Sequence, residues 1–106
     1  MIVTLTPNPS IDRTVILGDR LERGAVHRAE SVLSQAGGKG VNISRACCAA
    51  GVDTVAVLPA ADDDPFTHEL VGAGIHHSLV AAPGRVRVNL TISEPDGATT
   101  KINTPG

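Results

Sequence analysis

The chain has 106 residues, 42% of them hydrophobic and 19% charged, which is the composition of one globular unit. Nine Lys and Arg against eleven Asp and Glu give a formal net charge of −2, so no overall positive field attracts nucleic acid or an anionic membrane. A single Phe and no Trp or Tyr leave no aromatic platform on which single-stranded nucleic acid stacks. Nucleic-acid and membrane partners are therefore not expected.

The first predicted elements are strands. Residues 2–6 are rich in β-branched side chains and end at Pro7, which predicts a strand followed by a loop that carries Asn8, Ser10 and Asp12. Polar groups at the carboxyl end of a strand are where ligands of α/β proteins usually lie. Residues 14–17 and 27–33 predict two more strands, and because no helical pattern follows either of them, they suit an antiparallel flap.

A glycine-rich segment, residues 36–40, then leads into a predicted helix over residues 41–50 that ends at Gly51. A buried parallel strand over residues 53–58 precedes a second helix. Asp64 is its expected N-cap, Pro65 its first residue, and Gly72 or Gly74 its end.

The last predicted elements are strands again. Residues 75–80 form one, and residues 86–93 and 99–103 form a hairpin around a Pro-Asp-Gly turn at 95–97. The sequence predicts about seven strands but only two helices, which are too few to cover both faces of a parallel sheet. Since the sequence also stops on a turn, we expect the chain to be truncated.

The two cysteines indicate a reducing compartment. Cys47 and Cys48 are adjacent, so they cannot join distant segments, and no second pair completes a zinc site. The N-terminus reaches Pro7 before any apolar run of signal length, and no run is long enough to span a membrane. We therefore expect a cytoplasmic protein.

The glycine-rich segment fits neither standard phosphate motif. A Walker A loop fails because position 33 is Leu and Gly40 follows Lys39, and the dinucleotide fingerprint fails because position 43 is Ile. What remains is a glycine turn with a cation at a helix N-terminus, which favours an anion or a sugar hydroxyl. The alternative, which the glycines alone favour, is a plain β-to-α connection.

Other polar residues offer further chemistry. Asp12 can bind vicinal hydroxyls and Arg85 or Arg87 can bind a phosphate, although each is equally well explained as an exposed charge. The acidic run at residues 62–64 predicts a solvated turn with a helix cap rather than a cation site. His76 and His77 are strand neighbours that point to opposite faces, so we predict no metal site. No Ser-His-Asp or Cys-His arrangement indicates a hydrolase.

Taken in order, these segments resemble the N-terminal third of the PfkB family of carbohydrate kinases. The motifs that carry the resemblance are residues 4–12, 36–46, 57–60, 87–92 and 101–106. The resemblance implies an α/β, ribokinase-like fold with a partial parallel core, an antiparallel β lid from strands within about 14–33 and 86–103, and the C-terminal part absent. Gly-Gly-Lys-Gly and Thr-Pro-Asn-Pro are most similar to the 1-phosphofructokinase and tagatose-6-phosphate kinase branches, whose substrates already carry a phosphate.

The family's site residues map onto five positions. The resemblance implies that Asp12 binds sugar hydroxyls, that Gly38 and Asn42 hold the sugar, and that Lys39 and Arg87 bind its phosphate. The implied reaction is ATP-dependent phosphorylation of a sugar phosphate, such as fructose 1-phosphate to fructose 1,6-bisphosphate.

The same resemblance implies what this chain does not hold. The catalytic base, the ATP site and Mg²⁺ are expected beyond residue 106, so residues 1–106 alone should be inactive. A homodimer through the lid is also implied.

Two positions depart from the family pattern, because Ala61-Asp62 replaces Gly-Gly and Thr91 replaces a common Lys. Three other interpretations stay open at this point. The protein is a 6-phosphofructokinase or tagatose-6-phosphate kinase, or a non-catalytic module that binds sugar phosphate, or the product of a decayed gene without function.

Overall fold

The chain folds into two β-sheets that lie end to end. The computed structural model describes residues 1–105. A three-stranded parallel sheet, the core sheet, has the order β1-β4-β5, and a four-stranded sheet, the lid sheet, has the order β3-β2-β6-β7. The core strands are β1 (Ile2–Leu5), β4 (Thr54–Pro59) and β5 (His77–Val80). The lid strands are β2 (Ser10–Leu17), β3 (Ala29–Gly37), β6 (Arg87–Ser93) and β7 (Thr99–Ile102).

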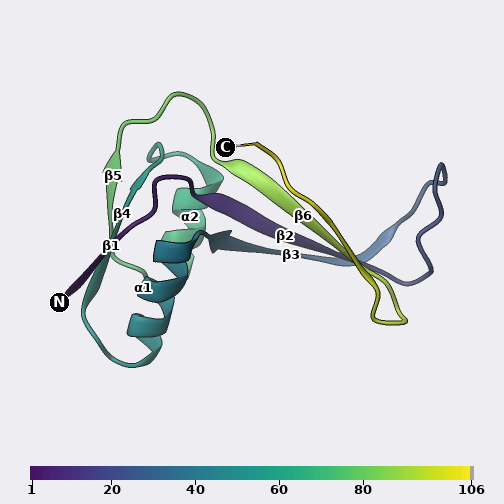
Figure 1. Cartoon of the computed structure of the whole chain (residues 1–106), viewed down its shortest axis with the longest axis horizontal. Helices are drawn as coiled ribbons and strands as arrows, with labels where there is room; N and C mark the ends of the chain where they lie inside the picture. The colour runs from purple at the N-terminus through teal and green to yellow at the C-terminus, as the bar shows by residue number, and fades with distance from the viewer. Residues whose placement is uncertain (106) are drawn as a thin grey trace.

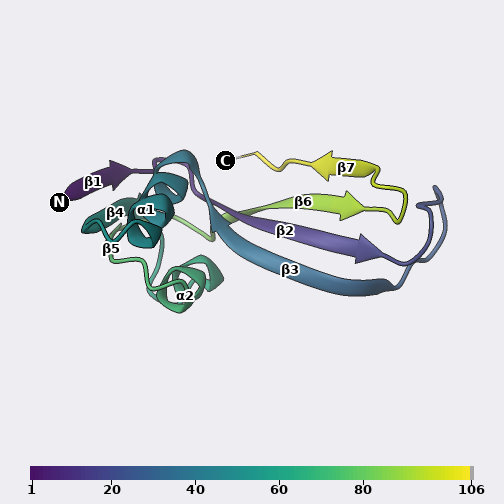
Figure 2. The same ribbon diagram turned by 90° about the horizontal axis from the view of Figure 1, so that it is seen from below.

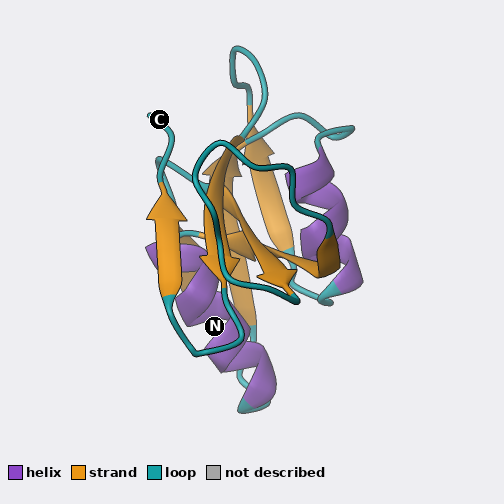
Figure 3. Ribbon diagram, turned by 90° about the vertical axis from the view of Figure 1, so that its right-hand side faces the viewer, coloured by secondary structure: helices purple, strands orange, loops and turns teal. Residues whose placement is uncertain are grey.

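The lid sheet extends away from the core sheet and the helices, so the molecule is elongated (Figures 1 and 2). Its dimensions are 47 × 33 × 18 Å and its radius of gyration is 15.5 Å, against about 13 Å for an ordinary domain of this length. Seen along its long axis, the molecule shows the lid strands in front of the two helices (Figure 3).

Both helices, α1 (Lys39–Ala49) and α2 (Pro65–Gly72), lie on the same side of the core sheet (Figure 1). Alternate residues of β4 are buried there, and Leu58 of that strand packs in one cluster with Val41 of α1 and with Phe66 and Leu70 of α2. As predicted, Asp64 caps α2 and Pro65 begins it. Neither helix of residues 1–105 is long and apolar enough to cross a membrane.

A chain of buried hydroxyls also joins α1 to the core sheet. Thr4 Oγ1 of β1 lies 2.7 Å from Ser44 Oγ of α1, which lies 2.9 Å from Thr54 Oγ1 of β4. All three side chains are buried, so each hydroxyl needs the others as partners. The network therefore fixes α1 against both strands.

The structure corrects the predicted loop around Asp12, because this segment is a strand. Ser10 and Asp12 lie within β2, which begins at residue 10 rather than 14, and β3 runs from residue 29 to Gly37 rather than from 27 to 33. The reason is pairing on both sides, because Ser10 is opposite Gly37 of β3 and opposite Arg87 of β6. These two neighbours, distant in sequence, keep the backbone extended where local propensity suggested a loop.

The lid sheet contains one pairing that the sequence did not predict. The β2–β3 and β6–β7 pairs are antiparallel, as expected for a flap. The central β2–β6 pair is parallel over seven residues of each strand, from Ser10 opposite Arg87 to Ile16 opposite Ser93. Both strands leave the core sheet in the same direction (Figure 2), so the lid is a mixed sheet.

Candidate functional site

One face of the lid sheet gathers polar side chains where it adjoins the core. Strand alternation and register place Ser10 and Asp12 of β2 on the same face as Arg87 and Asn89 of β6, with Asp12 directly opposite Asn89. Ser10 Oγ donates a 2.9 Å hydrogen bond to Asp12 Oδ1. The Asp12 carboxylate is exposed, so it can accept hydrogen bonds from a bound molecule.

The absence of a side chain at Gly37 leaves room for the Asp12 carboxylate. Gly37 lies opposite Ser10 on β3, and a Cβ at this glycine would collide with Asp12 Oδ2. The φ angle of Gly37 is not in the left-handed region, so space rather than backbone conformation requires glycine here. From the sequence, Gly37 is predicted only as part of the glycine turn that leads into the helix.

The N-terminus of α1 adjoins this face. Gly38 is its N-cap with φ 125°, and no side chain caps the first turn, which also contains no acidic residue. The exposed Lys39 is the first helical residue, so the chain presents a cation and uncapped N–H groups at the positive end of a helix. Only Gly38 of the predicted loop lies outside a regular element, since Gly37 ends β3 and Gly40 lies inside α1.

Thr6, which sequence reasoning did not select, seats this helix end on the core. A Cβ at Gly40 would lie 2.5 Å from Thr6 Oγ1 and 2.8 Å from the carbonyl oxygen of Leu5, and a Cβ at Gly38 would lie 2.5 Å from Thr6 Cγ2. The Thr6 hydroxyl is buried and has no hydrogen-bond partner among the described residues. The two glycines therefore allow α1 to begin in direct contact with the end of β1.

Asn42 lies in the first turn of α1 and its backbone N–H donates to the Gly38 carbonyl at 2.9 Å. Its exposed side chain accepts a 3.0 Å hydrogen bond from Arg45, whose other terminal nitrogen donates to the Ala36 carbonyl. Arg45 was likewise missed by sequence reasoning. It links α1 to the end of β3 and orients the Asn42 amide.

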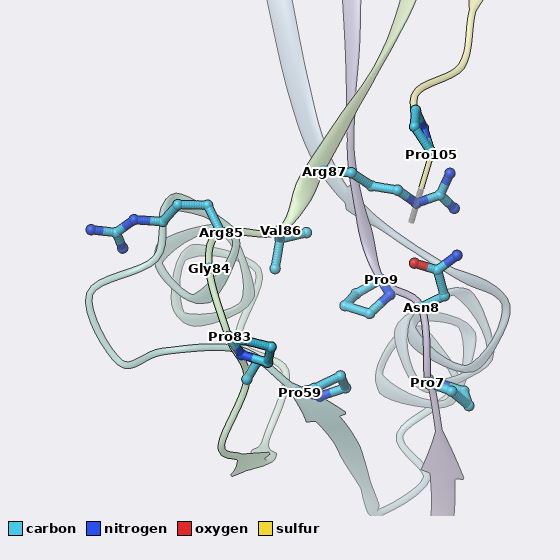
Figure 4. A pocket seen from close by; sticks show the side chains of 11 residues that line it. Pro7, Asn8, Pro9, Pro59, Pro83, Gly84, Arg85, Val86, Arg87 and Pro105 are labelled. Atoms are coloured by element: carbon cyan, nitrogen blue, oxygen red, sulfur yellow. The ribbon is translucent and has the colours of Figure 1, made fainter.

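Arg87 lies at the other end of the polar face, beside a cleft of about 250 Å³ (Figure 4). Its Nη1 donates to the Thr104 carbonyl at 3.0 Å and to Asn89 Oδ1 at 3.4 Å, while its buried Nε has no partner among residues 1–105. The cleft is lined by the loop after β1, the end of β4, the segment before β6 and the C-terminal segment: Pro7, Asn8, Pro9, Pro59, Ala82, Pro83, Gly84, Arg85, Val86, Arg87 and Pro105.

Arg85 is the exposed charge that the alternative interpretation described. Its guanidinium points away from Arg87 (Figure 4) and pairs with Asp63 at 3.1 Å. Hydrogen bonding and the positive charge of Arg85 hold the pKa of Asp63 below its ordinary value of 3.8. Arg85 is therefore committed to the α2 side of the junction rather than to the polar face.

The five predicted residues form a continuous arrangement but not a single cleft. Asp12 and Arg87 share one face on neighbouring strands, and Gly37 connects that face to Gly38, Lys39 and Asn42 at the start of α1. Of the five, only Arg87 lines the cleft of Figure 4. The arrangement therefore presents one carboxylate, one amide and two cationic side chains around the junction of the lid sheet and α1.

The structure shows the surroundings of both departures from the family pattern. The Ala61 carbonyl accepts from Thr67 Oγ1 at 2.6 Å and from the Asp64 N–H at 3.1 Å, and no residue of this turn needs a positive φ. The turn before α2 therefore does not require glycine. Thr91 lies directly opposite Lys101 of β7, so a cation is present on the same face one strand away.

Within residues 1–105, no group of three or more His, Cys, Asp or Glu side chains is placed to hold a metal ion. The acidic run corrects one expectation, because Asp64 is fully buried rather than solvated. His77 begins β5, and its Nδ1 lies 2.9 Å from the Ile75 carbonyl.

Comparison with known proteins gives a consistent result. No family model matches the sequence. The 1-phosphofructokinase of Xanthomonas campestris is 42% identical to the chain over 98% of its length, and the chain covers 33% of that protein. A solved structure of a phosphofructokinase from Staphylococcus aureus is 30% identical with a TM-score of 0.85, and the match spans all of this chain and 34% of the Staphylococcus chain. Phosphofructokinase-2 from Escherichia coli, solved with fructose 6-phosphate, is 27% identical with a TM-score of 0.86, and the match spans 99% of this chain and 35% of the Escherichia coli chain.

These similarities confirm the expected resemblance to the N-terminal third of a PfkB-type sugar kinase, and they confirm the α/β, ribokinase-like fold class. The chain spans about a third of the length of the relatives that it matches. The final glycine of the 101–106 motif, Gly106, lies outside the described residues.

Proposed function

We propose that this chain is the substrate-binding third of an ATP-dependent sugar-phosphate kinase of the 1-phosphofructokinase type, which converts fructose 1-phosphate to fructose 1,6-bisphosphate. The observation that carries the proposal is the register of the lid sheet, which places the Asp12 carboxylate and the Arg87 guanidinium on one face of two paired strands. Similarity to 1-phosphofructokinase along nearly the whole chain supports this substrate class.

The proposed roles follow from the chemistry of each group. Asp12 accepts hydrogen bonds from sugar hydroxyls, and the Gly38 backbone and the Asn42 amide hold the sugar at the start of α1. Lys39 and Arg87 bind the phosphate that the substrate already carries, with charge-assisted hydrogen bonds. The lid sheet lies over the sugar and excludes water from the transfer.

Residues 1–105 supply no obvious nucleotide or metal motif, because they contain no Walker A loop and no group of three or more His, Cys, Asp or Glu placed to hold a metal ion. We therefore assign the nucleotide site, the Mg²⁺ site and the catalytic base to the two thirds of the relatives' length that this chain does not span. The five residues above position the acceptor.

A second candidate is a 6-phosphofructokinase. Phosphofructokinase-2, which has the same fold over 99% of this chain, is solved with fructose 6-phosphate. The Thr-Pro-Asn-Pro opening leaves tagatose 6-phosphate as a third acceptor to compare. A non-catalytic binding module is the remaining alternative, and it would bind a sugar phosphate without turnover.

The test is a coupled ADP-release assay on the intact protein that contains this chain, with fructose 1-phosphate, fructose 6-phosphate, tagatose 6-phosphate and unphosphorylated fructose. We expect fructose 1-phosphate to give the highest kcat/KM. Arg87→Ala should raise its KM roughly ten- to a hundredfold, since it removes about 1.5–3 kcal/mol of charge-assisted hydrogen bonding. Arg85→Ala is the matched control, because Arg85 points away and pairs with Asp63. Equal effects of the two substitutions would refute the phosphate site.

The same assay on residues 1–106 alone should show no sugar-phosphate-dependent release of ADP. Phosphoryl transfer needs a base and donors that stabilise the moving phosphoryl group, and the five residues supply only acceptor binding. Turnover that Asp12→Ala abolishes would contradict this division of roles.

We further propose a cytoplasmic homodimer formed through the lid. The face of the lid sheet opposite the polar face carries a band of half-buried or exposed apolar side chains: Val15, Val32, Leu90, Ile92 and Ile102. Apolar bands of this kind mark protein interfaces, and phosphofructokinase-2 has a tetrameric inhibited form. The free, half-buried thiols of Cys47 and Cys48 are consistent with a reducing compartment.

Sedimentation of the intact protein tests the dimer. Ile92→Glu should produce monomers, whereas Ser93→Glu, on the opposite face of the same strand, should leave the dimer intact. A dimer that survives Ile92→Glu would place the interface elsewhere.

A further inference from the structure

One carboxylate joins the core to the lid. Asp64 is fully buried at the start of α2, where its Oδ1 accepts a hydrogen bond from the Phe66 N–H at 2.9 Å. Its second oxygen, Oδ2, accepts from the Val86 N–H, also at 2.9 Å. The first bond is an ordinary helix cap, and the second reaches 22 residues along the chain to the residue immediately before β6.

Capping alone does not require this second bond. Ser, Thr and Asn cap helices about as well as Asp, and a cap uses a single acceptor oxygen. A fully buried carboxylate is costly unless hydrogen bonds satisfy it. The two oxygens of Asp64 therefore do more than the single acceptor that capping α2 needs.

The bonded segment is the point where the chain passes from the core sheet to the lid sheet. Residues 81–86 connect β5 to β6, and Val86 directly precedes Arg87. Val86 and Val88 pack against the core cluster on one side of the strand, so the start of β6 is fixed by an apolar contact and by the Asp64 bond together. Next to them, the exposed Asp63–Arg85 pair spans the same junction.

We propose that Asp64 is a positioning residue that sets the place of Arg87. Because Val86 is hydrogen-bonded to the N-terminus of α2, Arg87, the first residue of β6, is held in register opposite Ser10. The Arg87 backbone is thereby fixed at the cleft that its guanidinium lines. This inference rests on the proposed function only for its phosphosugar readout, because the tether itself is a property of the fold.

Two substitutions separate the tether from the cap in the intact protein. Asp64→Asn keeps an oxygen for Phe66 but turns an amide donor toward the Val86 N–H, and Asp64→Ser keeps a single capping oxygen and removes the second acceptor. For both variants we expect the KM for the phosphosugar to rise by about tenfold, with kcat and the KM for ATP little changed. Asp63→Asn, which breaks only the exposed pair, is the control and should leave the KM unchanged.

A double-mutant cycle with Arg87→Ala tests the pathway of the effect. If Asp64 acts through Arg87, Asp64→Asn should not raise the KM further in the Arg87→Ala background. Additive effects would overturn the proposal, as would a lower kcat with an unchanged KM, which is the signature of a smaller folded fraction.

Hydrogen exchange keeps the tether testable without enzyme activity. In Asp64→Asn and Asp64→Ser the Val86 amide should exchange faster, while the Phe66 amide keeps its protection. Unchanged exchange at Val86 would refute the tether. An inactive wild-type protein would refute the proposed function and leave the tether to be judged by this exchange alone.

Discussion

The core and the lid are held together by different forces. The core cluster buries Phe66, Leu58 and Leu70 completely. In the lid, all four residues of β7 are exposed and every residue of β6 is only partly buried, so beyond Val88, which packs against the core cluster, backbone ladders rather than packed side chains hold these strands. Apolar burial is the dominant stabilising term in small domains, which means that the core stabilises the lid more than the lid stabilises the core.

A second contrast lies within the core sheet. The face beneath the helices buries Thr54, Ala56 and Leu58 of β4, whereas the opposite face leaves Val3 64% and Leu5 67% exposed. Parallel sheets normally have both faces covered. The relatives are about three times as long as this chain, so they have residues available for the second cover. For residues 1–106 alone, we expect low stability and a tendency to aggregate.

Breaking the core should give the largest effect. Phe66→Ala removes a fully buried aromatic side chain and should cost about 3–5 kcal/mol, which is comparable to the whole stability of a small domain. Circular dichroism should then show no cooperative thermal transition. Val26→Ala, in the lid loop where Val26 is 95% exposed, is the control and should leave the transition within a degree or two of wild type. Similar losses for both would contradict the ranking of core above lid.

The contact between the start of α1 and the end of β1 should be the next most sensitive to substitution. Gly40→Ala would bring a methyl group 2.8 Å from the Leu5 carbonyl oxygen, which is backbone and cannot easily move. We expect a loss of about 1–3 kcal/mol in denaturant unfolding. Gly72→Ala, at the end of α2 with open space around its Cβ, should instead be neutral or stabilise by up to about 1 kcal/mol. A neutral Gly40→Ala would mean that α1 does not begin in contact with β1.

The lid can be weakened without touching the core. Gly97 has φ +90° in the turn between β6 and β7, where its N–H donates to the Glu94 carbonyl at 3.0 Å. Gly97→Ala forces a side chain into this conformation at a cost of about 1–2 kcal/mol. Hydrogen exchange should accelerate in β6 and β7 and stay unchanged in β4 and α2. Faster exchange throughout would show that the two regions unfold as one unit.

The elements that the sequence predicted well depend on neighbours along the chain. The Asp64-Pro65 start of α2 and the turn at residues 95–97 are local signals, and both are where they were expected. The parallel β2–β6 pair and the strand around Asp12 depend on Gly37 and Arg87, which are far away in sequence. Period and propensity carry no information on such pairing, so Asp12 was placed in a loop.

The candidate site shows the same division. The motif residues were found from the sequence, whereas Thr6, Arg45 and the second bond of Asp64 emerge only from contacts between distant segments. An acidic run beside a Pro is typical of a solvated cap, and nothing local distinguishes the buried carboxylate of Asp64 from the exposed one of Asp63. The packing of Val86 against the core makes that difference.

The smallest expected effect concerns the exposed pair at the junction of the two regions. Arg85 lowers the pKa of Asp63 below 3.8, so the pair stabilises the folded state at pH values above the ordinary Asp range. That contribution is lost as the pH falls through the lowered pKa. In Arg85→Gln the pKa of Asp63, followed by NMR titration, should rise toward 3.8, and molar salt should have the same effect in wild type because both side chains are exposed. Lys101→Gln, on the outer strand of the lid, is the control and should leave this pKa unchanged. An unshifted Asp63 in Arg85→Gln would mean that the two side chains do not pair in solution, and the hydrogen bond from the Val86 N–H to Asp64 would then be the side-chain link at this junction that remains.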